Sequence, residues 1–211
     1  MVSLLTEHTC ARFQKEDSSE GNSITDMANI KLIETGIKDL FVIETTVFGD
    51  NRGYFTETYN KRAFAEVGLN YDFVQDNQSR SVKGVIRGLH FQKTHPQAKL
   101  VRVIWGSVFD VAVDLRKGSA TYGKWFGVTL TAENKKQLMI PRGFAHGFQV
   151  LSEVAEFCYK CDDFYCPGDE RGIIWCDPDI NISWPGTEPP VLSEKDTKHP
   201  RLAQSKTEFI L

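Results

Sequence analysis

Short apolar segments separated by turn residues dominate this chain and restrict the folds open to it. Each segment is rich in Val, Ile, Leu or Phe, and most have the length of a β-strand rather than that of a packed helix. Many short strands with close turn signals and little helix favour an antiparallel sandwich or barrel. The segments occupy residues 30–37, 40–48, 71–79, 85–92, 100–116, 124–130, 136–140, 146–151 and 155–161.

Two further local signals refine this all-β prediction. Residues 60–68 are the one good helix candidate, with Asn60 suited to the N-cap and Gly68 to the position after the last turn. Gly106-Ser107 separates two strand-like halves of residues 100–116 and predicts a two-residue β-hairpin. A Rossmann fold is disfavoured, because strands do not alternate with helices and no GxGxxG motif opens a helix.

The bulk composition excludes several classes of function. With 211 residues, one domain is the default expectation. The formal net charge of −3 and the lack of a basic run give no pull toward nucleic acid. No apolar run approaches the roughly 20 residues that a membrane-spanning helix needs. Five cysteines, an odd number, do not make a secreted disulfide framework. Without a visible signal peptide, we predict a cytoplasmic location.

The first residues differ in character from the rest. Residues 1–27 are polar and show little periodicity, as in the stretch EDSSEGNSITD. Such composition is typical of disorder. We therefore predict a disordered N-terminal extension or leader over residues 1–27 and a single β-rich domain over residues 28–211.

Arg87 and His90 pose a problem of parity within the strand-like stretch VIRGLHFQ. An odd offset places two side chains on opposite faces of a regular strand. A lone strand histidine is more often structural than catalytic, but Lys99 and Tyr159 on other predicted strands make a set of proton-transfer groups that a barrel interior would gather. His90 is then expected to face the interior, and Arg87 to reach it from a bulged or twisted strand end, a distortion that Gly84 and Gly88 permit.

Five ordered blocks make the sequence similar to a known family. They are DNRGYFTETYN, FVQDNQSRSVKGVIRGLHFQ, QAKLVRVIWGSVFDVAVDLRKGSATYGKW, IPRGFAHGF and LSEKDTKHPRL. Together, over about residues 30–203, these blocks resemble the dTDP-4-dehydrorhamnose 3,5-epimerase family. The resemblance implies a cupin-type jelly roll, a homodimer that pairs through its N-terminal strand near residues 28–36, and chemistry without a metal or another cofactor.

The resemblance also implies roles for individual residues. His90 matches the general base, Asp196 the carboxylate that orients it, Tyr159 the general acid, and Lys99 the residue beside the C4 oxygen of the sugar. The implied contacts to the nucleotide sugar are Arg52, Glu57, Gln75, Asp76, Asn77, Arg87, Lys99, His146, Glu170 and Lys195.

These residue types suit inversion of a carbon beside a ketone. Removing that proton forms an enolate, whose charge the cation of Lys99 would stabilise. An imidazole with an ordinary pKa of about 6.5 serves as a base near neutral pH. A phenol with a pKa of about 10 remains a neutral donor there. Inversion requires the two on opposite faces of the sugar, while Arg87 anchors the diphosphate.

Other motifs and functions are weaker hypotheses. Cys158 and Cys161 form a CxxC, but their odd offset points them apart, so free thiols are expected rather than zinc. A metal-binding cupin is a poor hypothesis for five histidines without a His-x-His. Asp110 and Asp114 share a strand face, and we expect rim or structural roles for them. The alternatives are an epimerase that inverts one centre or uses another nucleotide, and a non-catalytic cupin that binds nucleotide sugars.

Overall fold

The computed structural model describes residues 29–186, 189–205 and 209. The extension predicted at residues 1–27 lies outside the described residues, and the single domain predicted over residues 28–211 stays a prediction. No helix within the described parts of the chain is long and apolar enough to cross a membrane.

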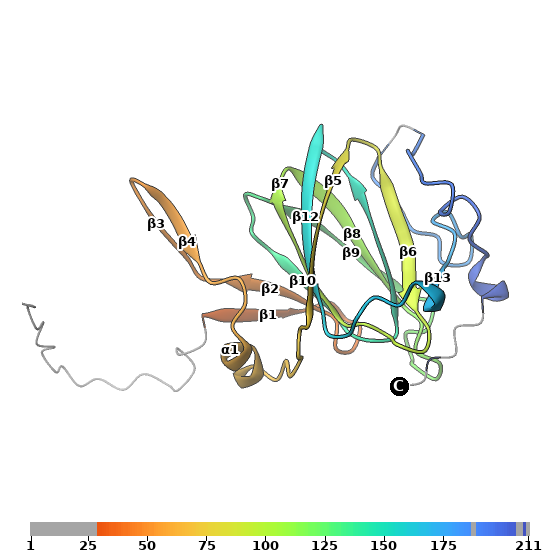
Figure 1. Ribbon diagram of the computed structural model, residues 1–211, viewed down its shortest axis with the longest axis horizontal. Helices are drawn as coiled ribbons and strands as arrows, with labels where there is room; N and C mark the ends of the chain where they lie inside the picture. Colours follow the sequence, from red (N-terminus) through yellow and green to blue (C-terminus); the bar gives the residue numbers. More distant parts are fainter. Residues whose placement is uncertain (1–28, 187–188, 206–208, 210–211) are drawn as a thin grey trace, which may run out of the picture.

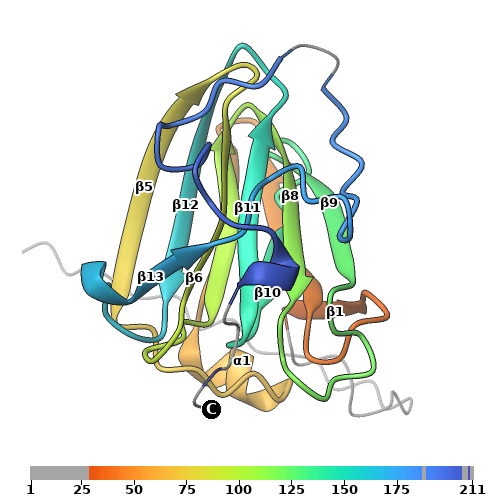
Figure 2. The same ribbon diagram turned by 90° about the vertical axis from the view of Figure 1, so that its right-hand side faces the viewer.

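Two antiparallel sheets face each other and confirm the predicted all-β jelly roll (Figure 1). The six-stranded sheet has the order β1 (Ile30–Glu34), β2 (Phe41–Thr45), β10 (Gln137–Ile140), β7 (Lys99–Trp105), β12 (Val154–Cys161) and β5 (Gln75–Val82). The five-stranded sheet has the order β13 (Glu170–Gly172), β6 (Ile86–Gln92), β11 (Phe144–Val150), β8 (Ser107–Asp114) and β9 (Trp125–Thr131). Figure 2 shows the second sheet with the C-terminal segment lying across its outer side.

The core lies between these sheets because each strand turns its apolar side chains inward. It includes Val101 and Phe157 from the six-stranded sheet and Val108 and Phe148 from the five-stranded sheet. The rings of Phe148 and Phe157 stack across the sandwich with centroids 4.3 Å apart. Such contacts fix the distance between the two sheets and therefore the width of any cavity between them.

The predicted hairpin at Gly106 is wrong. β7 and β8 are joined by this residue, but they belong to different sheets and do not pair with each other. Gly106 has a φ of +72°, and a Cβ there would lie 2.1 Å from the carbonyl oxygen of Val154. The glycine thus permits a tight corner between the sheets. A turn signal shows where a chain bends, but it does not determine which strands pair.

The predicted helix is confirmed as α1 (Lys61–Glu66). The Asn60 side chain accepts hydrogen bonds from the backbone N–H groups of Arg62 and Ala63, at 3.0 and 3.2 Å. Gly68 has a φ of +87°, which allows the chain to leave the helix. Two short 3₁₀ turns, η1 (Pro167–Asp169) and η2 (Leu202–Gln204), complete the helical elements among the described residues.

A separate two-stranded hairpin projects from the body of the molecule (Figure 1). It consists of β3 (Val47–Asp50) and β4 (Gly53–Thr56). Phe48, Tyr54 and Phe55 on this hairpin are between 54% and 66% exposed. A two-stranded hairpin is at best marginally stable alone in water, so these exposed aromatic side chains call for a partner surface.

Candidate active site

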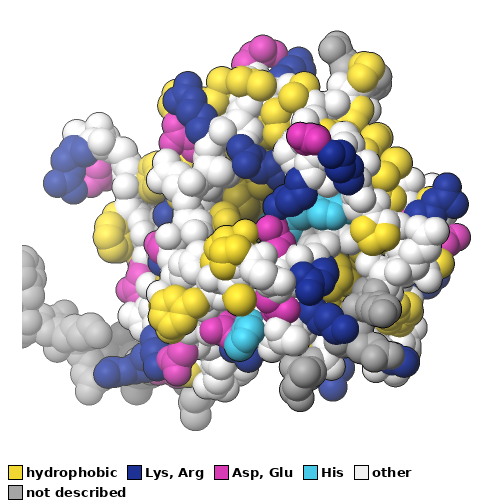
Figure 3. All heavy atoms as spheres, turned by 45° about the vertical axis from the view of Figure 1, so that its right-hand side comes forward, with side chains coloured by type: hydrophobic (Ala, Val, Ile, Leu, Met, Phe, Trp, Pro, Cys, Tyr) yellow, Lys and Arg dark blue, Asp and Glu magenta, His cyan; other side chains and the backbone are white. Residues whose placement is uncertain are grey.

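One end of the sandwich holds a cavity of about 730 Å³ between the two sheets. Figure 3 shows the hollow on this face, with charged and histidine side chains gathered around it. Most of the residues singled out in the sequence line this cavity, although they are up to 121 residues apart. They are Gln75, Asn77, Arg87, His90, Lys99, His146, Tyr159, Glu170, Lys195 and Asp196.

A bulge in β6 resolves the parity problem of Arg87 and His90. In the pairing of β6 with β11, His90 lies opposite His146 and Arg87 lies opposite Phe148, so one residue of β11 spans two of β6. Gly88 has a φ of +128°, and a Cβ there would lie 2.6 Å from the Cα of Gly147. The extra residue turns both side chains into the cavity, as the sequence predicted from Gly88.

The imidazole of His90 is paired with a buried carboxylate. Its Nε2 lies 2.5 Å from Oδ1 of Asp196, whose side chain is 3% exposed. Because a carboxylate only accepts, Nε2 carries the proton and Nδ1 keeps the lone pair of a base. Burial lowers the pKa of His90, and the hydrogen bond that His90 donates to Asp196 partly offsets that effect. The arrangement keeps a neutral, oriented base.

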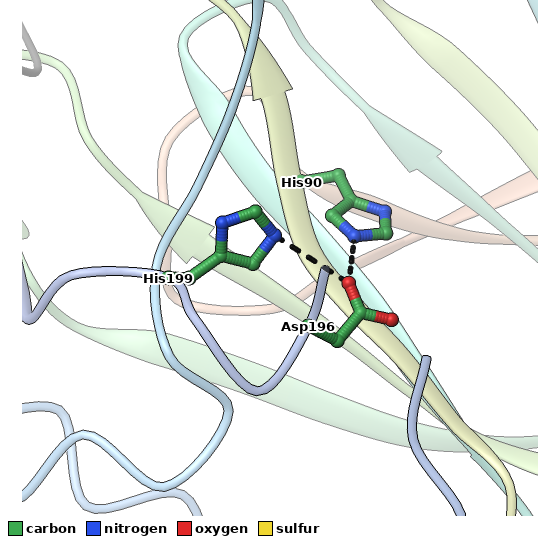
Figure 4. A group of neighbouring side chains, drawn as sticks. All are labelled: His90, Asp196 and His199. Atoms are coloured by element: carbon green, nitrogen blue, oxygen red, sulfur yellow. Dashed lines mark hydrogen bonds and ion pairs between the residues drawn. The ribbon is translucent and has the colours of Figure 1, made fainter. Parts of the chain in front are cut away.

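A second histidine, His199, lies at the same carboxylate and was missed in the sequence (Figure 4). Its Nε2 lies 3.4 Å from Oδ1 of Asp196, on the other side from His90. Burial alone would raise the pKa of Asp196, but His199 and His90 together hold it well below its usual range. Nothing in the sequence signalled this contact, because it depends on how the segment after β13 returns to β6.

His90, Asp196 and His199 are also the described group able to offer three metal ligands, with ligand atoms within 4.8 Å of one another. Two ligands on a tetrahedral zinc ion lie roughly 3.3 Å apart, given metal–ligand distances near 2.0 Å. The 2.5 Å between His90 and Asp196 fits a shared proton instead. As arranged, His90 and Asp196 form a hydrogen-bonded pair.

Tyr159 and Lys99 enter the cavity from the opposite sheet. Tyr159 on β12 shares its face with Phe157, two residues earlier in the strand, with ring centroids 6.1 Å apart. Burial raises the pKa of Tyr159, so its hydroxyl remains a proton donor at neutral pH. Lys99 on β7 has its Nζ 6.0 Å from the centroid of that ring. Burial lowers the pKa of Lys99, and the negative charge of Glu170 partly offsets the shift.

Polar groups at the mouth of the cavity are held by one another. Nε of Arg87 donates to the Ser81 hydroxyl at 3.0 Å. Nζ of Lys195 donates to Glu170 at 2.7 Å, and the Tyr165 hydroxyl donates to the same carboxylate at 2.9 Å. Tyr165 was not predicted. Arg87 lines a cavity that has room for an anion.

His146 is supported by an aspartate that the sequence analysis placed at a rim or in a structural role. Its Nε2 lies 3.0 Å from Oδ2 of Asp110, and the Asp110 side chain is fully buried. A rim position for Asp110 is therefore wrong, and the partner of His146 is the physical reason that a carboxylate is tolerated there. Asp114, by contrast, is structural: it pairs with Arg116 and accepts from Ser119 and Thr121.

Three of the predicted contacts lie outside the cavity of their own chain. Arg52 sits in the turn of the β3–β4 hairpin with an 85% exposed side chain that pairs with Asp50. Glu57 follows β4 and is exposed. Asp76 is exposed and bonds Lys160 at 2.8 Å, because alternation along β5 turns Gln75 and Asn77 inward and Asp76 outward.

The described cysteines Cys158, Cys161, Cys166 and Cys176 are free. Cys161 lines the cavity, whereas Cys158 is half-buried near Arg102 and Glu156. The two therefore point apart, as their odd offset predicted. Burial raises the pKa of the Cys161 thiol to about 11, so it is protonated and unreactive at neutral pH.

His90, paired with Asp196, and Tyr159 line one cavity of a jelly-roll β-sandwich from opposite sheets, an arrangement that suits acid–base chemistry. The comparisons with known proteins agree. The chain belongs to the dTDP-4-dehydrorhamnose 3,5-epimerase family, whose profile matches residues 34–204. Members of this family are isomerases.

Individual relatives show how far the similarity extends. The dTDP-4-dehydrorhamnose 3,5-epimerase of Pseudomonas aeruginosa is 57% identical over 168 residues, which are 79% of this chain and 93% of that protein. The dTDP-4-dehydrorhamnose 3-epimerase of Streptomyces niveus is 39% identical, covering 86% of this chain and 88% of its own length. A dTDP-6-deoxy-D-glucose-3,5-epimerase from Legionella pneumophila, solved with dTDP-4-keto-L-rhamnose, superposes with a TM-score of 0.83 at 49% identity and covers 85% of this chain and 96% of its own.

Proposed function

We propose that the chain converts dTDP-4-dehydro-6-deoxy-D-glucose to dTDP-4-dehydro-L-rhamnose by epimerisation at C3 and C5. The observation that carries this proposal is the placement of His90 on β6 and Tyr159 on β12, strands of opposite sheets that line one cavity. A hexose between the sheets would have a base on one side and an acid on the other. Inversion of a carbon needs both.

The chemistry follows from the charges of these groups. The lone pair on Nδ1 of His90 takes the proton from the carbon beside the 4-keto group, and Asp196 stabilises the imidazolium that forms. The electron pair of the broken C–H bond moves to the keto oxygen, where the ammonium of Lys99 stabilises the enolate. The Tyr159 hydroxyl then delivers a proton to the opposite face of the same carbon. Solvent returns both groups to their starting protonation states, and the two centres react in turn.

The polar mouth of the cavity suits a nucleoside diphosphate. Arg87 and Lys195 supply positive charge for the two phosphates, and the planar guanidinium of Arg87 fits phosphate oxygens in a bidentate way. Gln75 and Asn77 are held together by a side-chain hydrogen bond of 2.9 Å and offer donors and acceptors for the nucleoside. Glu170 fixes Lys195, and Asp110 fixes His146 toward the sugar end.

We further propose a homodimer that works in the cytoplasm. The free cysteines support a reducing compartment. The projecting β3–β4 hairpin supports the dimer, because Phe48 and Phe55 need cover that their own chain does not give. Docking of the hairpin on a second copy would also bring Arg52 and Glu57 to the partner's cavity. Light scattering at micromolar concentration should give twice the mass of one chain, and Arg52→Ala should raise KM more than it lowers kcat.

One experiment tests the reaction itself. The purified protein is mixed with dTDP-4-dehydro-6-deoxy-D-glucose in D2O, and proton NMR follows both carbons. The double epimerase predicts deuterium at C3 and C5. Deuterium at C3 alone would instead support a single-centre enzyme, the activity named for the Streptomyces niveus relative. No exchange at either carbon, with the nucleotide sugar still bound, would support the non-catalytic alternative.

A further inference from the structure

We infer that His199 is a positioning residue that shares the Asp196 carboxylate with His90 and thereby makes His90 a weaker base. The effect that we expect on epimerisation rests on the proposed function. The interaction among His90, Asp196 and His199 does not. Figure 4 shows the two imidazole rings side by side, with both Nε2 atoms directed at Oδ1 of Asp196. The separations are 2.5 Å from His90 and 3.4 Å from His199.

The imidazole of His199 fits where it does because residue 172 is a glycine and has no side chain. A Cβ on Gly172 would lie 2.4 Å from both Cε1 and Nε2 of His199, so the imidazole occupies the space that any other residue would fill. Gly172 lies on β13 directly opposite His90 in the pairing with β6. The glycine therefore admits a second ring beside the base, with ring centroids 5.6 Å apart and an interplanar angle of 74°.

The Nε2 atom of His199 lies near one acceptor, Oδ1 of Asp196. It is buried and makes no regular hydrogen bond within the described residues, and Oδ1 of Asp196 is the acceptor that it faces. The side chain is 11% exposed, so bulk water screens the interaction little. A slight approach of the two groups would complete an N–H···O bond to the oxygen that His90 uses.

The sign of the effect follows from this sharing. A fully charged carboxylate at 2.5 Å favours the imidazolium form of His90, and a base that is already protonated cannot abstract a proton. A donor from His199 to Oδ1 neutralises part of that charge and favours neutral His90. The other charged groups facing His90 are Lys195, beside Asp196, and Glu170 on β13, and these two are paired with each other at 2.7 Å.

Two substitutions of similar size test whether His199 acts by donating a hydrogen bond or only by filling space. His199→Phe fills the same space without a donor, whereas His199→Gln keeps an N–H near the position of Nε2 and does not titrate. His199→Phe should move the acid limb of the kcat/KM profile upward by about one pH unit, so that activity at pH values below the limb falls by up to about tenfold. At about pH 8.5 it should stay within about twofold of the unsubstituted enzyme. His199→Gln should leave the limb in place.

A purely structural role would lower activity equally at all pH values, and that result would overturn the inference. An acid limb unmoved by His199→Phe, or moved equally by His199→Gln, would overturn it too.

Gly172→Ala supplies an independent displacement of the ring, and alanine is otherwise tolerated there because the backbone is not left-handed. This substitution should shift the limb as His199→Phe does, but should have no further effect in the His199→Gly background.

A readout without substrate keeps the inference separate from the proposed reaction. The pKa of His90 can be measured from the ring signals of ¹⁵N-labelled protein during a pH titration. It should be about one unit higher in His199→Phe than in the unsubstituted protein. An unchanged value would refute the role of His199 whether or not the chain epimerises the proposed sugar. A raised value together with no epimerisation would sustain the inference and refute the proposed reaction.

Discussion

The two walls of the cavity hold their reactive groups in different ways. On the side of β6, His90 is paired with Asp196, which has His199 as a second neighbour. On the side of β7 and β12, Lys99 makes no ion pair among the described residues, and the Tyr159 hydroxyl has no protein acceptor there. His90 is therefore oriented by contacts within the protein, whereas Lys99 and Tyr159 have no such side-chain partner among the described residues.

This difference indicates which side chains must have a fixed orientation before the substrate binds. A base must present one particular nitrogen, so a tautomer has to be fixed in the empty enzyme. A cation that stabilises an enolate and a hydroxyl that donates a proton act on oxygen and carbon atoms of the substrate itself, so their final partners arrive with it. Burial without a partner is the physical cause of the lowered pKa of Lys99 and the raised pKa of Tyr159.

Removing the restrained base should have the largest effect. We expect His90→Asn to lower turnover by about 10²–10⁴, the usual contribution of a general base. His95→Asn is the matched control, since the His95 side chain is 59% exposed and lies outside the cavity. Steady-state kinetics of both variants measure the difference, and normal turnover in His90→Asn would remove the imidazole from the mechanism.

Removing the unrestrained cation should have the next largest effect. Lys99→Met should lower kcat by about 10²–10³, because a charge that develops on the keto oxygen loses its partner. KM should change little, since the neutral ketone gains less from that cation than the enolate does. Lys160→Met, on the outer face of β12, provides the control. A loss seen only in KM would mean that Lys99 binds substrate without stabilising the intermediate.

The pH dependence should distinguish the two walls. In the proposed reaction His90 acts when neutral, and burial lowers its pKa, so the acid limb of kcat/KM should lie below about 6.5. Lys99 acts when charged, and burial lowers its pKa too, so the alkaline limb should lie below about 10.4. Activity should fall about tenfold for each pH unit beyond either limb. Lys99→Arg should move the alkaline limb alone, and an unmoved limb would assign it to another group.

The smallest effect is expected outside both walls. Asp76→Asn should leave kcat/KM within about twofold and cost less than about 1 kcal/mol of stability, because its exposed ion pair with Lys160 faces away from the cavity. Urea unfolding and steady-state kinetics measure both quantities. A tenfold rise in KM would instead return Asp76 to the substrate contacts that its motif implied.

Local patterns in the sequence were sufficient for the strands, the capped helix and the inward face of β12. Alternation also predicts that Gln75 and Asn77 share a face, while Asp76 does not. A distortion of this strand was predicted only indirectly, because Arg87 and His90 cannot both face the cavity from a regular strand. The strand pairing around Gly106 was not foreseen, because pairing is decided by the sheets and not by the residues of the turn.

The missed residues depend on contacts between distant segments. Asp110 lies 36 residues before its partner His146. A carboxylate among the apolar residues of FDVAVD nevertheless implied a buried partner, and that signal was available. His199 reaches the base only because Gly172 leaves a space beside β6, and no local pattern encodes that. Arg52 and Glu57 are exposed and lie outside the cavity, so their predicted contacts depend on the proposed dimer.

The most direct test of two opposed proton-transfer groups is the reaction of Tyr159→Phe in D2O. His90 should still exchange the C3 and C5 protons of dTDP-4-dehydro-6-deoxy-D-glucose, so NMR should show deuterium entering with the original configuration kept. Formation of the inverted sugar should fall by about 10² or more, because its donor is gone. Inversion at the normal rate in this variant would contradict the account, since the phenol would then not be the acid that faces the imidazole across the sugar.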